Sequence, residues 1–307
     1  MTAMRDTFFN YLYEKAQADR NIVILSADFS APSLDKFRLN IPQQYQFMGI
    51  SEQNMMLVAA GLALEGKKVF CYAIAPFLTL RCLEQTKLYA SGMDLPITLV
   101  GVGAGISYED SGYTHHALED ISVLRSLPHM KVFQPCDNED TEKVVAYALE
   151  YRHPMYVRLD RYGIDRLYDG EHDIQKGLSI VSGGHPVLLL ASGSMMKVAL
   201  EAVKELSADG IQVSLLNAET IPFDQEKFIQ ALYGVHDIIT MEEHSLSGGL
   251  GSYVAELVVD LGLKVNVKRV GFDLSEGYID EFGGREVIYN QYGMDKDTVI
   301  KLVKERI

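Results

Sequence analysis

The chain has 307 residues, which is enough for two domains of ordinary size. Its 48% hydrophobic and 23% charged residues are typical of a soluble globular protein and exclude a disordered chain. The formal net charge of −14 argues against nucleic-acid binding, which needs clustered lysine and arginine. Neither a run of 18 apolar residues nor a basic and then apolar leader is present, so we expect a cytoplasmic protein without a membrane span.

Three cysteines, Cys71, Cys82 and Cys136, occur without the spacing of paired ligands. They predict neither a disulfide framework nor a zinc site, and they fit a reducing compartment. We therefore expect no metal ligands in this chain.

In the first half of the chain, short apolar or β-branched runs alternate with longer helical patterns. Such runs, bounded by turn residues, are typical of buried strands. They predict strands at residues 22–26, 68–72, 97–102, 130–133 and 155–158. The helices between them are expected at residues 7–18, 54–65, 80–91 and 139–150. The alternation predicts a mostly parallel sheet with helices on both faces, which is a three-layer α/β/α domain.

A polar stretch between residues 162 and 185 interrupts this rhythm, and a second series of apolar runs follows it. These runs lie at residues 187–194, 213–217, 238–242 and 265–270, and helices are expected at 195–208 and 251–261. We therefore predict two α/β domains with mostly parallel sheets. The first covers residues 1–165, a linker covers 166–185, and a smaller second domain covers 186–307.

Residues 49–55, with the sequence Gly-Ile-Ser-Glu-Gln-Asn-Met, place the lone acid Glu52 before a strongly apolar helical pattern. The helix dipole favours an acid in a first turn, which is one explanation of Glu52. The segment also resembles the run G-I-A-E-Q-N-M in the pyrimidine-binding domain of transketolases and 1-deoxyxylulose-5-phosphate synthases. The resemblance implies that Glu52 is catalytic, because the family's glutamate bonds to the pyrimidine ring of thiamine diphosphate and activates it.

Residues 72–85 are similar to a second family segment, F-x-x-F-x-x-x-R-x-x-[DE]-Q. The similarity implies that Phe77 stacks on the aminopyrimidine, that Ile74 replaces the other phenylalanine, and that Arg81 belongs to the cofactor site. A lone Phe77 would otherwise be a packing residue. Asp28 fits the family element S-A-D-L-[ST] beside the cofactor, although an acid after a strand is also an ordinary turn or cap residue.

The loop at residues 105–121 follows a predicted strand, where parallel sheets place ligands. It is similar to the transketolase loop G-E-D-G-x-[ST]-H-Q-x-x-E-D, which implies that His115 orients substrate oxygens and assists proton transfers. His116 takes the place of the glutamine in the substrate site. Ser111 stands where the family has a substrate-binding aspartate and Asp110 where it has glutamate, so which of the two contacts the donor hydroxyl stays open. As metal ligands, the paired histidines lack a third partner.

Three arginines match positions that hold the sugar phosphate in the family. Arg158 and Arg161 follow residues 155–157 of the last predicted strand and resemble the segment [RL]-x-x-R, with Arg161 the closer match. Arg5 resembles the arginine that opens this domain. A planar guanidinium suits a phosphate dianion, so the resemblance implies substrate binding by these side chains.

Residues 241–252 contain a glycine-rich turn between a strand and a helix, which looks superficially like a dinucleotide fingerprint. The third glycine is missing at Val254 and no acid is suitably placed downstream, so a cofactor loop is not predicted. The turn resembles [TV]-x-E-E-x-x-x-x-G-G-x-G-S in the C-terminal domain of deoxyxylulose phosphate synthases, where it supports folding and subunit contact.

The family binds the diphosphate through Mg²⁺ with a G-D-G motif and a later asparagine, and this chain has no such motif. The resemblance therefore implies the C-terminal subunit of a split transketolase, whose partner subunit contributes most of the Mg²⁺ and diphosphate site in a heterotetramer. The implied reaction transfers a two-carbon ketol unit from a ketose or ketose phosphate to an aldose.

Two further interpretations of the sequence stay open. One is a subunit that uses pyruvate in the manner of 1-deoxyxylulose-5-phosphate synthase. The other is a degenerate regulatory subunit, suggested by Ser111 and the missing diphosphate motif. A beta subunit of a 2-oxoacid dehydrogenase would instead require a histidine-serine loop, which residues 114–116 do not provide.

Overall fold

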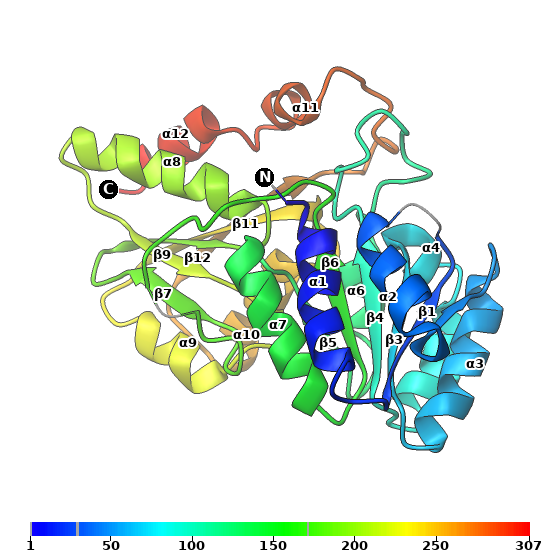
Figure 1. Ribbon diagram of the computed structural model, residues 1–307. Helices are drawn as coiled ribbons and strands as arrows, with labels where there is room; N and C mark the ends of the chain where they lie inside the picture. Colours follow the sequence, from blue (N-terminus) through cyan, green and yellow to red (C-terminus); the bar gives the residue numbers. More distant parts are fainter. Residues whose placement is uncertain (1, 29–30, 171) are drawn as a thin grey trace.

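The computed structural model describes residues 2–28, 31–170 and 172–307, which form two α/β domains side by side (Figure 1). The first sheet has seven strands in the order β10-β5-β6-β4-β3-β1-β2. Its pairings are parallel except that of β10 with β5. The strands are β1 (Ile22–Ser26), β2 (Tyr45–Phe47), β3 (Lys68–Ile74), β4 (Ile97–Val102), β5 (Lys131–Phe133), β6 (Met155–Leu159) and β10 (Thr220–Ile221).

Helices cover both faces of this sheet. Side chains of α1, α2 and α7 form an apolar core on one face, and those of α3, η3 and α6 contribute to the core on the other. The helix expected at 80–91 is instead divided into the short elements α5 and η3. A separate short helix, α4, precedes them and has Pro76 in its first turn. The bounds are α1 (Met4–Ala16), η1 (Pro32–Leu34), α2 (Asp35–Asn40), η2 (Pro42–Gln44), α3 (Glu52–Leu64), α4 (Ala75–Thr79), α5 (Leu83–Gln85), the π-helical η3 (Thr86–Ser91), α6 (Asp120–Leu124) and α7 (Asn138–Glu150).

The second sheet has five strands in the order β12-β11-β8-β9-β7, and only β7 is antiparallel to its neighbour. Its strands are β7 (Ser179–Ser182), β8 (Val187–Ala191), β9 (Ser214–Asn217), β11 (Asp237–Ser245) and β12 (Asn266–Phe272). Its helices are α8 (Met195–Ala208), α9 (Gln225–Ala231), α10 (Leu250–Asp260), α11 (Arg285–Gln291) and α12 (Lys296–Lys304). Strand β7 lies inside the segment expected to be a linker, so the second sheet begins before residue 186.

One apolar core runs through both domains. It contains Ile121 and Leu124 of α6 together with Leu188 of β8 and Val254 of α10. In addition, β10 follows β9 of the second sheet and pairs with β5 of the first. The two domains therefore share buried surface and a strand.

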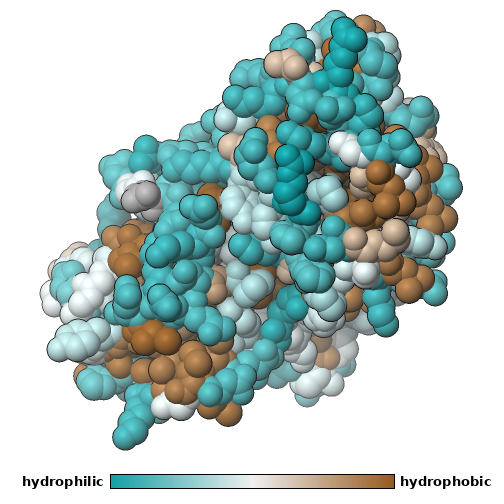
Figure 2. Space-filling view, turned by 90° about the horizontal axis from the view of Figure 1, so that it is seen from below, coloured by the Kyte–Doolittle hydropathy of each residue, from teal (hydrophilic) through white to brown (hydrophobic). Residues whose placement is uncertain are grey.

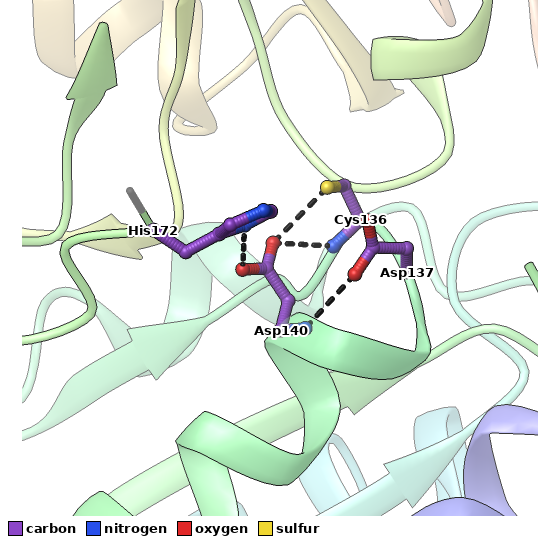
Figure 3. Close-up of side chains that lie close together, drawn as sticks. All are labelled: Cys136, Asp137, Asp140 and His172. Atoms are coloured by element: carbon purple, nitrogen blue, oxygen red, sulfur yellow. Dashed lines mark hydrogen bonds and ion pairs between the residues drawn. The ribbon is translucent and has the colours of Figure 1, made fainter. Parts of the chain in front are cut away.

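A buried polar cluster at the start of α7 also joins the domains (Figure 3). The carboxylate of Asp140 pairs with His172 Nδ1 and accepts a hydrogen bond from Cys136 Sγ at 3.0 Å. It also accepts one from Asn217 Nδ2 of β9 at 3.2 Å. Burial raises the pKa of the Cys136 thiol, with the Asp140 charge adding to the effect, so Cys136 is not an activated nucleophile.

Apolar side chains also reach the surface, and Figure 2 shows two areas of them on the face seen from below. Helix α3 carries several, among them Leu57 at 45% exposure and Leu64 at 61%. Within the described ranges of the chain, no helix combines the length and hydrophobicity needed to cross a bilayer.

Candidate active site

Most of the predicted site residues lie at one edge of the seven-stranded sheet. Asp28 follows β1, Phe77 follows β3, His115 follows β4 and Arg161 follows β6. Glu52 is the first residue of α3. Since these four strands are parallel, the loops at their carboxyl ends meet at the same edge, where α/β sheets bind ligands.

Glu52 is the buried acid of this edge. Only 3% of the residue is exposed, and its Oε2 accepts a hydrogen bond from Arg81 Nη1 at 2.8 Å. The Arg81 guanidinium lies over the Phe77 ring, 4.4 Å from the ring centre. Arg81 therefore neutralises the carboxylate and stacks on the aromatic ring at the same time.

The contacts continue from Phe77 across the loop after β4. The ring of His115 meets the Phe77 ring edge-on at 5.1 Å between centres, and Thr114 Oγ1 lies 2.9 Å from His115 Nδ1. The ring of Tyr108 lies 5.9 Å from that of His115, and the Arg161 guanidinium lies 4.9 Å from the Tyr108 ring centre. We call this continuous set of side chains the carboxyl-edge strip: Glu52, Arg81, Phe77, His115, Tyr108 and Arg161.

Asp28 and Arg5 lie beside this strip. Tyr72 Oη donates a hydrogen bond to Asp28 Oδ2 at 3.3 Å. Burial raises the pKa of Tyr108, and the nearby Asp28 charge raises it further. Burial opposes the charge of Arg5, but Tyr72 and Asp6 outweigh it and raise the pKa of the guanidinium. Phe29 and Ser30, which complete the S-A-D-L-[ST] resemblance, lie outside the described residues.

The remaining predicted residues take different positions. Asp110 and Ser111 are both exposed, and the Ser111 N–H donates to the Tyr108 carbonyl in a turn, so the geometry does not choose between them as substrate contacts. Ile74 is half-buried and packs against the core of the first domain. His116 is only 3% exposed, and burial and the neighbouring His115 lower its pKa, which keeps it neutral.

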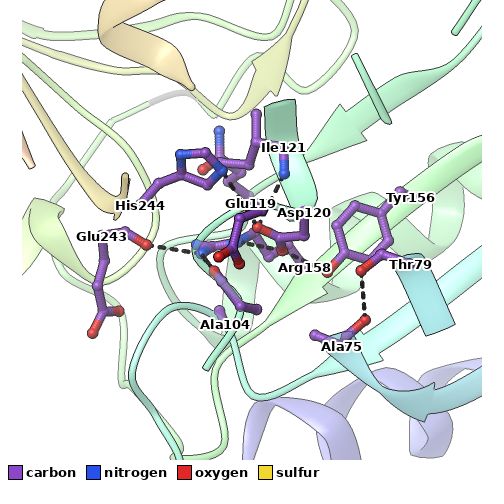
Figure 4. A network of polar contacts seen from close by, with 12 residues as sticks. Ala75, Thr79, Ala104, Glu119, Asp120, Ile121, Tyr156, Arg158, Glu243 and His244 are labelled. Atoms are coloured by element: carbon purple, nitrogen blue, oxygen red, sulfur yellow. Dashed lines mark hydrogen bonds and ion pairs between the residues drawn. The ribbon is translucent and has the colours of Figure 1, made fainter. Parts of the chain in front are cut away.

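Arg158 does not fit the predicted role of substrate binder. It is 4% exposed, its Nε donates to Asp120 Oδ2 at 2.8 Å, and its Nη2 donates to the carbonyls of Ala117 and Glu243 at 2.7 and 2.8 Å (Figure 4). A buried guanidinium that donates to these three acceptors holds the protein together and does not reach a substrate. The side chain points into the core from inside β6, whereas Arg161 lies exposed in the loop beyond the strand.

The glycine-rich turn before α10 already holds a carboxylate. Glu242 accepts hydrogen bonds from the N–H groups of Leu250 and Gly251 at 2.6 and 2.7 Å. A Cβ on Gly249 would lie 2.0 Å from Glu242 Oε2. The N-terminus of α10 therefore binds a side chain of its own chain in the place where a dinucleotide fold binds phosphate.

Sequence reasoning overlooked Tyr108 and Tyr72 as members of the site. Tyr108 links His115 to Arg161, and Tyr72 links Asp28 to the same region. The available signal for Tyr108 was its place in the loop that carries His115. Tyr72 lies inside β3 and had no signal of its own.

The chain matches two sequence families along most of its length. Residues 1–164 match the family described as "Transketolase, pyrimidine binding domain", and residues 177–303 match "Transketolase, C-terminal domain". The fold and the matched domains define the class of thiamine-diphosphate-dependent enzymes. Within this class, the chain belongs to the transketolase family. The expected fold class and family are confirmed.

Several relatives that match along nearly their full length are named as transketolase subunits. The chain is 34% identical over 310 residues to a subunit of the apulose-4-phosphate transketolase of Phocaeicola vulgatus, covering 99% of this chain and 97% of that protein. It is 33% identical over 305 residues to the "6-deoxy-6-sulfo-D-fructose transketolase subunit SqwH" of Clostridium sp., covering 98% and 94%. The solved structure "Split gene transketolase, inactive beta4 tetramer" superposes with a TM-score of 0.86 at 32% identity, covering 99% and 97%. The named sugars differ between relatives.

Proposed function

We propose that this chain supplies the pyrimidine half of a thiamine-diphosphate site to a two-component transketolase. The complex transfers a two-carbon ketol unit from a ketose or ketose phosphate to an aldose. The observation that carries this proposal is the carboxyl-edge strip, in which a buried carboxylate, an aromatic ring, a histidine and an exposed arginine follow one another in contact. Membership of the transketolase family supports it.

The residues of the strip fit the aminopyrimidine of the cofactor. Glu52 and Phe77 already hold a planar, hydrogen-bonding group, the guanidinium of Arg81, which is bonded to the carboxylate and stacked on the ring. An aminopyrimidine offers the same flat face and a ring nitrogen for the carboxyl group. When bound, thiamine diphosphate would supply the nucleophilic carbon for cleaving the bond beside a ketose carbonyl.

Each side chain of the site then has a distinct task. Glu52, when protonated, would donate a hydrogen bond to the pyrimidine ring, for which the Arg81 guanidinium would have to leave its place on the Glu52 carboxylate and the Phe77 ring. His115 holds substrate hydroxyls and moves protons, which suits an imidazole near neutral pH. Arg161 and Arg5 bind the phosphate of a phosphorylated sugar, as planar guanidinium groups do.

Exposed apolar side chains on the outer face of α3 favour contact with a partner subunit. Leu57, Val58 and Leu64 are exposed there, while the inner face of the helix is buried in the core. A helix that is apolar on both faces normally lies inside an assembly. Because Glu52 opens this helix, a partner that covers α3 would stand next to the carboxyl-edge strip. We propose that this partner is the diphosphate- and Mg²⁺-binding subunit, in a heterotetramer.

The test is reconstitution with the partner subunit and an assay of ketol transfer and bound thiamine diphosphate. Glu52→Gln keeps the size of the side chain but removes the ionisable carboxyl group, so turnover should fall by about 10²-fold or more. Glu65→Gln changes an exposed acid at the other end of α3 and should be neutral.

The same assay separates the alternatives. Release of carbon dioxide from pyruvate would favour chemistry like that of 1-deoxyxylulose-5-phosphate synthase. A complex that binds no cofactor would favour a regulatory subunit. Near-normal ketol transfer by the Glu52→Gln variant would remove Glu52 from the mechanism.

A further inference from the structure

Three potential metal ligands converge at the amino edge of the first sheet, opposite the carboxyl-edge strip. Asp94, His129 and His153 stand two or three residues before β4, β5 and β6, respectively. Strand β6 lies between β5 and β4, and all three are parallel. The sheet topology therefore brings three loops from distant parts of the sequence together, with His153 in the middle.

The side-chain geometry approaches that of a coordination sphere. His153 Nδ1 lies 2.8 and 2.9 Å from the two carboxylate oxygens of Asp94, and His129 Nδ1 lies 3.9 Å from Asp94 Oδ1. The two imidazole rings stack with an angle of 14° between their planes. One ligand atom from each residue lies within 4.8 Å of the others. Tetrahedral ligands about 2.0–2.1 Å from a Zn²⁺ ion stand roughly 3–4 Å apart, so small side-chain rotations would complete the site.

An ordinary ion pair explains only part of this arrangement. Asp94 and His153 form one, but His129 at 3.9 Å is too far from the carboxylate for a hydrogen bond and still turns its Nδ1 toward it. Asp94 and His129 also have φ values of +51° and +63°, and in the described part of the chain they are the two non-glycine residues with positive φ. Both strained positions thus belong to the same cluster.

We propose that Asp94, His129 and His153 bind one transition-metal ion of the Zn²⁺ class. Two imidazoles and a carboxylate are the donor set of zinc, whereas Mg²⁺ and Ca²⁺ prefer oxygen ligands alone. The three side chains are 37% to 52% exposed, which leaves a coordination position for water. The ion would join the loops before β4, β5 and β6 at the far edge from Glu52. This site differs from the sequence-based expectation of no metal ligands in this chain.

The test is a Zn²⁺ titration of the full chain after chelator treatment, by calorimetry, with Co²⁺ absorbance to report the ligands. We expect one Zn²⁺ per chain and a rise in the melting temperature with Zn²⁺, because an ion that binds only the folded state stabilises it. His153→Gln should weaken Zn²⁺ binding by about tenfold or more. Loss of a group that only hydrogen-bonds to a metal ligand can already lower metal affinity by that factor. His129→Asn should do the same, because asparagine tolerates its positive φ.

His236→Gln is the matched control, because His236 is an exposed histidine before β11 in the other domain. It should bind Zn²⁺ as the unchanged chain does, and circular dichroism should show that each variant is folded. The proposal is overturned if the unchanged chain binds no Zn²⁺. It is equally overturned if the folded His129→Asn and His153→Gln variants bind Zn²⁺ with unchanged affinity.

Discussion

His244 shows how the protein tunes a single buried side chain. Burial lowers the pKa of His244 to about 4; the Asp120 charge opposes this effect and Arg158 adds to it. The Nδ1–H donates to the Ser245 carbonyl at 2.8 Å, and Nε2 lies 3.8 Å from Asp120 Oδ1. His244 is therefore neutral in the folded protein at neutral pH.

This shift predicts a loss of stability in acid. In the unfolded chain a histidine titrates near pH 6.5. Between about pH 6.5 and 4, His244 is therefore protonated in the unfolded state and neutral in the folded state. The contribution of neutral His244 to the free energy of unfolding is fully present above pH 6.5 and is lost as the pH falls toward 4. The loss is on the order of 3 kcal/mol at most for a shift of this size.

His244→Asn keeps a donor for the Ser245 carbonyl and should flatten this dependence. Urea unfolding at pH 7, 6 and 5 measures the difference in slope between variant and unchanged chain. His236→Gln serves as the exposed control. Equal slopes for His244→Asn and the unchanged chain would show that His244 titrates normally in the folded state.

At the scale of an element, α7 depends on the cap formed by Asp137. Asp137 Oδ1 accepts the N–H of Asp140 at 2.9 Å, and Oδ2 accepts the N–H of Leu167 at 3.0 Å. Asp137 is completely buried. One carboxylate thus starts the helix and fixes the chain that leads toward the second domain.

Asp137→Ala should therefore cost more than an ordinary cap. Loss of a cap costs about 1 kcal/mol, and the partly buried N–H of Leu167 left without an acceptor adds up to about 1–3 kcal/mol. Asp295, which caps α12 through the N–H of Thr298, is the control, and Asp295→Ala should cost about 1 kcal/mol. Denaturant unfolding compares the two. Equal losses would mean that the bond to Leu167 contributes nothing.

At the scale of the whole molecule, Glu243 is the polar centre of the junction between domains. It accepts hydrogen bonds from Arg285 Nε at 2.9 Å, Ser194 Oγ at 2.7 Å and the N–H of Ile106 at 3.3 Å. Arg285 also binds Asp160 of the first domain at 2.7 Å. The charges of Glu243 and Asp160 raise the pKa of Arg285 against the effect of burial. One arginine thus balances two acids from different domains.

Arg285→Met should destabilise the junction strongly. The methionine fills similar space but leaves Glu243 and Asp160 without a countercharge, and breaking a buried pair in this way costs about 3–5 kcal/mol. Lys304→Met removes an exposed pair with Asp209 and should cost less than about 1 kcal/mol. Thermal unfolding followed by circular dichroism measures both. Similar melting temperatures for the two variants would contradict a central role for Arg285.

Local sequence patterns predicted much of the architecture. The strand at residues 22–26 and the helix at 195–208 coincide with β1 and α8, because runs of apolar residues and helical periodicity are local signals. The helix expected at 54–65 corresponds to α3, which begins two residues earlier, at Glu52. The catalytic and binding roles of Glu52, Phe77 and His115 stay predictions.

Tertiary structure decided what depends on contacts between distant residues. The short strands β7 and β10 have weak patterns of their own and exist through pairing with β9 and β5. Arg158 is buried and Arg161 is exposed, although their sequence spacing predicted substrate binding for both. Strand order also brought Asp94, His129 and His153 together from three loops. The sequence by itself determined most of the elements and the family. The convergence and burial of distant residues were set by the order and direction of the strands, which local patterns do not encode.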